Sequence, residues 1–309
     1  MAGPILVTGS HRSGTTWVGK LLARAPGLTY VHEPFNPGRA PGWIGGRLPH
    51  WYLYVTSGNE RAYAPALERV VALRYPIGLD VPRLRTARQA GQVALEWPRS
   101  LVARARGDRP LLKDPIALFS SEWLARRFGA RVVVMVRHPA AFAGSLKRLG
   151  WAFDFRNWAD QPLLLRDLLS PYADAVRAFA RSERDIIDQA ILMWNGIHHA
   201  IALFRERHPD WAFVKYEELA ARPLEGFRDL AGRLALPWDP RMEDAVARFS
   251  SERNRGEVPR WLHRSVKRDS RAAARTWLSR LTEEERARVR AGTEDVARAF
   301  YTEADWAPV

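Results

Sequence analysis

The sequence predicts an α/β fold of three layers, in which helices cover both faces of a central parallel sheet. Short apolar runs, bounded by glycine, proline or charge, alternate with segments of helical periodicity, as in parallel sheets with helical crossovers. The chain has 309 residues, of which 47% are hydrophobic, so it is long enough to bury a large core. We expect residues 1–309 to form a single domain.

Five apolar runs are predicted to form the strands of the sheet: Pro4–Thr8, Leu28–His32, Pro110–Lys113, Arg131–Val136 and Trp211–Lys215. Helical patterns follow most of these runs. The helix candidates include Thr15–Arg24, Leu118–Arg127, Ala140–Leu149, Glu183–Arg207 and Glu283–Phe300. Ligands of such sheets bind beyond the carboxyl ends of the strands, so we expect the functional site at that edge.

Three stretches do not fit this alternation. Residues 35–64 are rich in Gly, Pro, Trp and Tyr, residues 151–182 mix aromatic and charged side chains, and residues 251–280 are strongly basic. Long irregular segments in a compact domain are usually binding loops or disordered. We therefore expect these stretches to contribute loops around the site.

The net charge of +14 is compatible with an anionic ligand, with nucleic acid or with an acidic membrane surface. The absence of cysteine excludes disulfides and thiolate metal sites. No apolar run approaches the roughly 18 residues that a membrane span requires, and no secretory signal is recognisable. We expect a soluble cytoplasmic protein without membrane insertion, for which peripheral contact with a membrane is still possible.

The first strand leads directly into GSHRSGTT, residues 9–16. Its two glycines are spaced as in a Walker phosphate loop, but Thr15 stands where that loop has lysine. A glycine turn that opens a helix still gathers backbone N–H groups and the helix dipole around an anion. Asp114 is the only candidate for a magnesium-binding strand end, and proline follows it. We therefore expect an anion held without metal, with Arg12 as its nearest cation.

HRSGTTW, residues 11–17, resembles the loop PKSGTTW of the sulfotransferases that use 3′-phosphoadenosine 5′-phosphosulfate (PAPS). The resemblance implies a P-loop-type fold and a PAPS co-substrate. The residues that it assigns to the 5′-phosphosulfate are Arg12, Ser13, Gly14, Thr15, Thr16 and Trp17. In VVVMVRHPAAFAGSL, Arg137 and Ser145 are spaced like the arginine and serine that bind the 3′-phosphate in that family.

The resemblance extends toward the C-terminus. Residues 213–237 are similar to the strand, turn and helix whose tyrosine lies near the adenine of PAPS, which implicates Tyr216. Residues 263–285 resemble the basic segment that covers the donor in bacterial members. Its candidate phosphate contacts are Arg264, Lys267, Arg268 and Arg271, of which Arg268 and Arg271 are carried forward.

Sulfuryl transfer to a hydroxyl needs a base for the hydroxyl proton and cations for the charge of the leaving phosphate. YVHEPF resembles the Glu-Pro that follows the second strand of carbohydrate sulfotransferases, so Glu33 is the favoured base, ahead of His32 and Asp114. Lys113 belongs to a KDP motif that several bacterial members share. Either it contacts the sulfuryl oxygens or the acceptor, or it is a surface residue.

The acceptor is expected to lie against residues 35–64 and 151–182, with residues 251–280 covering the donor. Aromatic side chains suit sugar rings, phenols and lipids alike, and the Glu-Pro resemblance favours a carbohydrate or glycolipid hydroxyl. A phenolic or other natural-product acceptor is one alternative, and a P-loop kinase or a nucleic-acid-binding protein is another. The aromatic residues of the first stretch are Phe35, Trp43, Trp51, Tyr52, Tyr54 and Tyr63.

Overall fold

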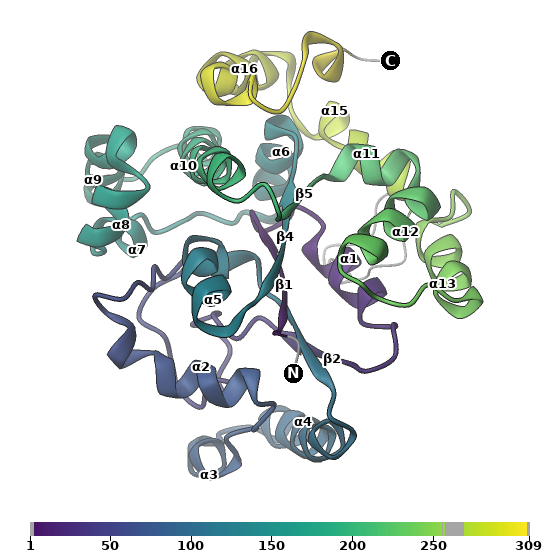
Figure 1. Ribbon diagram of the computed structural model, residues 1–309. Coiled ribbons are helices and arrows are strands. Elements are labelled where there is room, and N and C mark those ends of the chain that lie inside the picture. Colours follow the sequence, from purple (N-terminus) through teal and green to yellow (C-terminus); the bar gives the residue numbers. More distant parts are fainter. Residues whose placement is uncertain (1–2, 255, 257–268, 308–309) are drawn as a thin grey trace.

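The computed structural model describes residues 3–254, 256 and 269–307. Its centre is a five-stranded parallel sheet with the strand order β2–β3–β1–β4–β5 (Figure 1). The strands are β1 (Ile5–Gly9), β2 (Leu28–His32), β3 (Arg109–Lys113), β4 (Arg131–Val136) and β5 (Ala212–Lys215). Each lies within one residue of a predicted run, so the predicted α/β class and all five strands are confirmed.

Helices connect and cover the strands. The α-helices are α1 (Thr15–Leu22), α2 (Ala64–Val71), α3 (Ile77–Asp80), α4 (Ala87–Arg106), α5 (Ser121–Phe128), α6 (Pro139–Leu149), α7 (Arg156–Ala159), α8 (Pro162–Asp167), α9 (Ala173–Arg181), α10 (Ile186–Arg207), α11 (Tyr216–Ala221), α12 (Pro223–Arg233), α13 (Pro240–Ser250), α14 (Ser270–Arg275), α15 (Trp277–Arg280) and α16 (Glu283–Ala297). The 3₁₀ helices are η1 (Glu60–Ala62), η2 (Val81–Arg83), η3 (Pro115–Ser120), η4 (Ser170–Tyr172) and η6 (Glu303–Trp306).

Alternate residues of the strands fill two separate cores, one on each face of the sheet. Leu6 and Val134 pack with α5, α6 and α10, whereas Ile5 and Val133 pack with α1, α12 and α13. This alternation is what a strand with both faces buried requires. The two helical layers are visible on either side of the sheet in Figure 1.

The sequence analysis missed several helices. Residues 151–182, expected to be irregular, largely form α7, α8, η4 and α9, and α14 and α15 lie within 251–280. The 20-residue α4 was not expected at all. It begins with a capping box between Thr86 and Gln89, contains Pro98 and ends at Gly107 in the left-handed conformation. An internal proline normally argues against a helix, so Pro98 weakened the helical signal of this segment.

The parallel register brings the carboxyl ends of the strands to one edge. His32 and Val7 both lie opposite Lys113, and Gly9 lies opposite Met135. Gly9 has a φ of 134°, and a Cβ there would lie 2.3 Å from the Met135 carbonyl oxygen. Glycine is therefore required where β1 turns into the phosphate loop.

Asp114 ties together the segments that leave β2 and β3. One oxygen of its fully buried carboxyl accepts a hydrogen bond from Phe35 N at 2.6 Å, and the other accepts one from Ile116 N at 3.1 Å. Burial, reinforced by the charge of Glu33, raises the pKa of Asp114 to about 8. Asp114 thus fixes the path of the chain immediately after Glu33.

We predict that Asp114→Asn lowers the free energy of unfolding by about 1–3 kcal/mol, because its amide NH₂ faces one of the two backbone N–H groups. Since the folded pKa is raised, the Asp114 contribution to stability falls as pH rises from about 4 to about 8, and the variant should lack this slope. Denaturant titrations across that pH window measure both effects. The matched control is the exposed Asp174→Asn, and equal stability of the two variants would contradict the assigned role.

Candidate active site

A cavity of about 1490 Å³ opens beyond the carboxyl ends of the strands. The phosphate loop, Arg137 and Tyr216 line one side of it. His32, Glu33 and residues of α4 line the other. The predicted position of the site is therefore where the structure has a cavity large enough for two ligands.

The phosphate loop is held in shape by its backbone conformation and by Tyr216. Arg12 has a φ of 66° and Gly14 a φ of 92°, both in the left-handed region. Ser13 Oγ donates a hydrogen bond to Ser10 O at 2.5 Å. A Cβ on Gly14 would lie 2.5 Å from Cδ2 of Tyr216. Only glycine allows the loop to pack this closely on the tyrosine ring.

The loop and the second motif meet through two arginines. Arg12 Nε donates a hydrogen bond to Ser145 Oγ at 3.0 Å. Arg137 donates to the carbonyl oxygens of Arg12 at 2.9 Å and Ala273 at 3.0 Å. Its guanidinium carbon lies 4.1 Å from the centre of the Tyr216 ring. Residues that the sequence separates by more than 120 positions thus form one cationic cluster.

Three buried polar atoms of the loop region and of Arg137 have no hydrogen-bond partner among the described residues. They are Ser10 Oγ, Trp17 Nε1 and Arg137 Nε. Buried donors normally have partners, so an unmatched guanidinium N–H beside a cavity is a feature that an anionic ligand would satisfy. Together with the amino end of α1, the cluster fits a ligand that carries phosphate groups.

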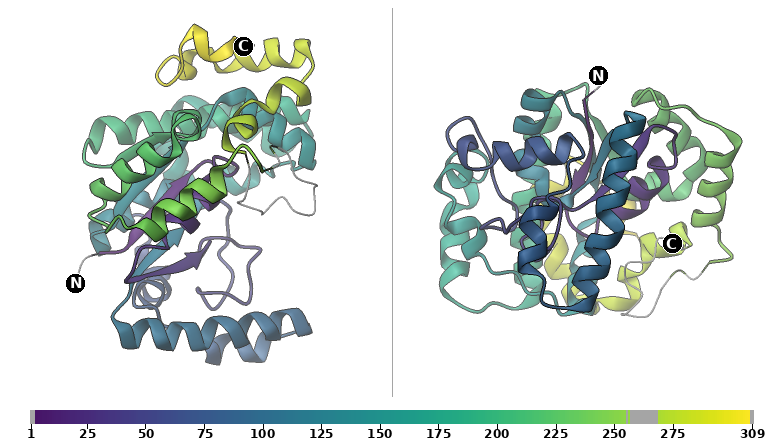
Figure 2. Two further views of the ribbon diagram at one scale, coloured as in Figure 1. Left: turned by 90° about the vertical axis from the view of Figure 1, so that its right-hand side faces the viewer. Right: turned by 90° about the horizontal axis from the view of Figure 1, so that it is seen from below.

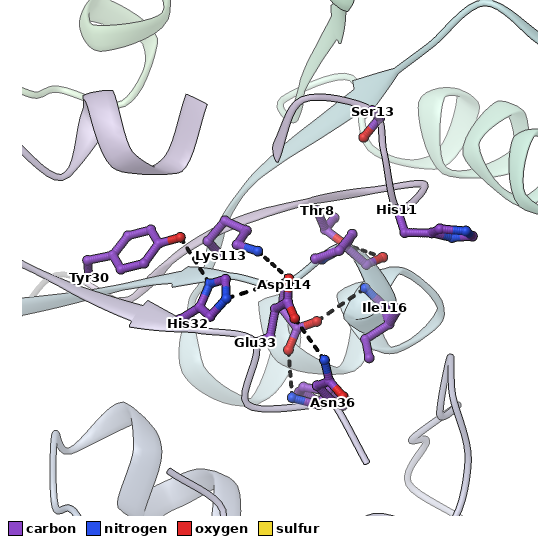
Figure 3. Close-up of polar contacts among 12 residues, drawn as sticks. Thr8, His11, Ser13, Tyr30, His32, Glu33, Asn36, Lys113, Asp114 and Ile116 are labelled. Atoms are coloured by element: carbon purple, nitrogen blue, oxygen red, sulfur yellow. Dashed lines mark hydrogen bonds and ion pairs between the residues drawn. The ribbon is translucent and has the colours of Figure 1, made fainter. Parts of the chain in front are cut away.

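Glu33 and Lys113 form an ion pair on the opposite side of the cavity (Figure 3). Glu33 Oε1 contacts Lys113 Nζ, and Oε2 accepts a hydrogen bond from Asn36 Nδ2 at 2.8 Å. Burial alone would raise the pKa of Glu33, but the charge of Lys113, then that of His32 and the hydrogen bonds from Lys113 and Asn36, lower it to about 2. The carboxyl group is therefore ionised at neutral pH.

Lys113 lies behind Glu33 and does not reach the cavity wall. Its side chain is 1% exposed, compared with 21% for Glu33. Burial lowers the pKa of Lys113, and the charge of Glu33 opposes that shift. The surface alternative for Lys113 is wrong, because the residue is fully buried. A buried lysine needs an opposite charge beside it, and Glu33 supplies that charge.

The other predicted site residues fall into distinct groups. Ser13 and Ser145 are buried behind the wall, and Asp114 serves the backbone. Arg271 points away, because its guanidinium bonds to Ala221 O and Glu252. Arg264, Lys267 and Arg268 lie outside the described residues. The predicted residues that line the cavity are Arg12, Gly14, Thr15, Thr16, Trp17, His32, Glu33, Arg137 and Tyr216.

The aromatic residues of 35–64 mostly belong to the core. Phe35, Trp43 and Tyr54 are buried there, and only Trp51 and Tyr52 of that group line the cavity. Their abundance therefore reflects packing more than binding. Because a buried aromatic and a binding aromatic look alike in sequence, composition could not separate them.

The sequence analysis also missed His11 and Trp151. Burial, reinforced by the charge of Arg12, lowers the pKa of His11 to about 3, so its ring is neutral. His11 N donates a hydrogen bond to the Tyr52 hydroxyl at 3.0 Å, and His11 Nδ1 lies 2.7 Å from the same oxygen. Trp151 lies 5.4 Å from the Arg12 guanidinium. The position of His11 inside the phosphate loop was a signal that could have found it.

Comparison with protein families identifies the family of the chain. The sequence profile of the sulfotransferase family matches residues 4–240, more than half of the chain. The chain belongs to the sulfotransferase family. The protein is accordingly an enzyme with sulfotransferase activity, and the kinase and nucleic-acid alternatives are set aside.

One solved structure supports this fold. The sulfotransferase aligns with the sulfotransferase domain from the curacin biosynthetic pathway at 13% identity and a TM-score of 0.54, over 97% of each chain. It also aligns with the sulfotransferase domain of the Synechococcus PCC 7002 olefin synthase (18% identity, TM-score 0.48, 97% and 96% of the two chains) and with STF9 from Mycobacterium avium (15%, 0.46, 98% and 78%). No curated protein gave a significant match. Within the described residues, no helix has the length and apolar character of a membrane span.

We predict that Gly14→Ala destabilises the sulfotransferase by about 1–3 kcal/mol, because φ is positive and the new Cβ meets Tyr216. Thermal or denaturant unfolding measures the change. Gly232→Ala is the matched control, since nothing lies within 4 Å of a Cβ there, and in helix α12 it should be neutral or stabilising. Equal effects of the two substitutions would refute the tight packing of the loop on Tyr216.

Proposed function

We propose that this sulfotransferase moves a sulfuryl group from PAPS to a hydroxyl of a carbohydrate or glycolipid. The observation that carries the proposal is the cluster of Arg12, Ser145 and Arg137 beside the amino end of α1. It offers two fixed guanidinium groups to one cavity, as a donor with two separate phosphate positions requires. The donor itself carries the reactive sulfuryl group.

The loop side of the cavity is the proposed donor side. The backbone N–H groups of Gly14, Thr15 and Thr16, with Arg12, would hold the 5′-phosphosulfate, whereas the N–H of Ser13 donates to Ser10 O within the loop. Arg137 would hold the 3′-phosphate through the N–H that is otherwise unmatched. Tyr216 and Trp17 would flank the adenine. Arg268 stays a candidate phosphate contact. Arg271 is not one, because its guanidinium bonds to Ala221 O and Glu252.

Glu33 is the proposed base. Each oxygen of a carboxylate accepts two hydrogen bonds, so both Glu33 oxygens can still receive one from an acceptor hydroxyl despite Lys113 and Asn36. The ion pair keeps Glu33 ionised and aimed across the cavity, but it also limits its basicity. Lys113 therefore acts as a positioning residue. Its ion pair with Glu33 must weaken when Glu33 takes up the proton of the acceptor hydroxyl.

The acceptor is proposed to lie between Glu33 and the two tryptophans Trp51 and Trp151. Both indole rings line the cavity and are partly exposed, and such flat apolar surfaces suit the faces of sugar rings. A phenolic acceptor would use the same rings. The choice of a carbohydrate or glycolipid depends on the Glu-Pro resemblance at residues 33–34.

We predict that Arg137→Ala weakens binding of adenosine 3′,5′-bisphosphate about ten- to a hundredfold, through the loss of a charge-assisted hydrogen bond. Binding of adenosine 5′-phosphosulfate, which has no 3′-phosphate, should change much less. Calorimetry in EDTA measures both, because no metal is needed to bind either ligand. The control is Arg131→Ala, which removes a bond to Leu234 O away from the cavity. Equal losses for both ligands would make Arg137 purely structural.

We predict that Glu33→Gln lowers kcat by about 10²–10⁴-fold, because it removes the base; the amide keeps the size of the side chain, while the buried Lys113 loses its ion pair. Binding of adenosine 3′,5′-bisphosphate should be nearly unchanged. A donor-labelled assay under conditions where chemistry limits turnover measures kcat. His32→Ala is the control and should cost little.

The ionisation of Glu33 sharpens this test. Because its pKa is lowered to about 2, the wild-type enzyme should show no loss of kcat from protonation of Glu33 as pH falls from neutral to about 4. Retention of more than about half of wild-type kcat by Glu33→Gln would reject the assignment. Since Asp114 does not line the cavity, His32 would then be tested first.

A further inference from the structure

Helix α4 is amphipathic in the opposite sense to a normal surface helix. Its inner face is mostly small or polar: Ser100 and Ala103 are buried together with the apolar Val93, and Gln89 and Gln92 donate hydrogen bonds to the carbonyl oxygens of residues 40 and 41. At 100° per residue, the exposed side is apolar across its centre. The exposed apolar residues are Ala87, Ala90, Ala94, Leu95, Trp97, Pro98, Leu101, Val102 and Ala105.

The apolar surface continues onto the neighbouring helices. Leu79 of α3 is 44% exposed and Val81 of η2 is 50% exposed, and α3 packs against α4. Of the nine large hydrophobic side chains that are exposed among the described residues, six lie on this one surface. We call it the α4 surface, and it comprises Leu79, Val81, Leu95, Trp97, Leu101 and Val102. Figure 2 shows α4 along the outer edge of the molecule. A gathered patch of this kind normally faces a partner or a membrane.

Arginines flank the apolar stripe of α4 on both sides. At helical spacing, Arg104 lies along one flank and Arg88, Arg99 and Arg106 along the other, and all four are exposed. Glu96 is the only acidic residue of the helix. A helix about 30 Å long with an apolar centre and cationic flanks matches the chemistry of an anionic bilayer surface.

The α4 surface also adjoins the cavity. Pro98, Arg99, Val102 and Arg106 line it, on the side opposite the phosphate loop. A bilayer against α4 would therefore lie next to the proposed acceptor side. A second copy of the chain paired through the same stripe would instead bring the arginines of both copies together, which repel each other.

We propose that the α4 surface docks this enzyme on bilayers that contain anionic lipids, with Leu95, Trp97 and Leu101 entering the headgroup boundary and the flanking arginines contacting lipid phosphates. Docking concerns a surface outside the proposed donor site. Its consequence, that the acceptor hydroxyl is presented from a membrane lipid, rests on the proposed function.

The first test is co-sedimentation with vesicles of phosphatidylcholine alone and of phosphatidylcholine mixed equally with phosphatidylglycerol. The wild-type protein should bind the mixed vesicles and bind them less as salt increases. The triple variant Leu95→Gln, Trp97→Gln, Leu101→Gln should bind at least about tenfold more weakly, since its apolar anchors are gone. Leu224→Gln, an exposed leucine on α12, is the matched control and should bind like wild type.

The second test removes charge only. Arg88→Gln with Arg104→Gln should weaken binding to the mixed vesicles about thirtyfold, as expected for two arginines at an anionic surface. Neither residue lines the cavity. The matched control, Arg126→Gln with Arg241→Gln, changes two exposed arginines elsewhere and should have a smaller effect.

Three results would overturn the proposal. They are equal binding to neutral and anionic vesicles, unaltered binding by the triple variant, and a wild-type dimer in sedimentation that the triple variant abolishes. Calorimetry with adenosine 3′,5′-bisphosphate separates this inference from the proposed function, because that ligand does not need α4. Intact nucleotide binding without vesicle binding would refute the docking surface alone.

Discussion

The hydrogen bond from Arg137 to the carbonyl oxygen of Arg12 joins the two halves of the proposed donor side. One end belongs to the residue that follows β4, and the other lies within the loop that follows β1. Through the same guanidinium, the chain also reaches Ala273 and the face of Tyr216. Tyr216 packs against Gly14, whose backbone is left-handed, and such conformations persist only where the surroundings enforce them. The proposed phosphate-binding groups are thus held in place without a ligand, which would lower the ordering cost of binding.

Three ionisable groups at the ends of β2 and β3 show how burial and pairing divide their roles. Glu33 has a cation beside it and some contact with water, and its pKa falls. Asp114 is one residue from that cation but fully buried, and its pKa rises. The same side-chain chemistry therefore supplies an ionised group facing the cavity and a structural group behind it. Lys113 connects them, and its charge is tolerable in the interior only because Glu33 lies in contact with it.

The sequence was sufficient to predict the sheet and the glycine turn after β1, because buried strands and glycine turns leave local signals. It placed Arg137 and Ser145 together, yet Ser145 bonds to Arg12 across the sheet edge, a contact that no local spacing encodes. Arg271 fitted the family pattern but pairs with Glu252. Helix α4 escaped detection because its apolar residues face outward and Pro98 interrupts them, so the usual rule that apolar residues mark the core pointed to no helix. Tertiary context decided each of these cases.

The strand order separates the proposed donor side from the proposed acceptor side. The proposed donor side is built on β1 and β4, each held by neighbours on both sides, whereas Glu33 follows β2, which is an edge strand paired with β3 alone. The chain after β2 is instead held by side-chain contacts, among them the hydrogen bond from Phe35 N to Asp114, and helix α4 is held by the hydrogen bonds of Gln89 and Gln92. Substitutions at the β2 edge would therefore alter the proposed acceptor side while leaving β1 and β4, which support the proposed donor side, in place.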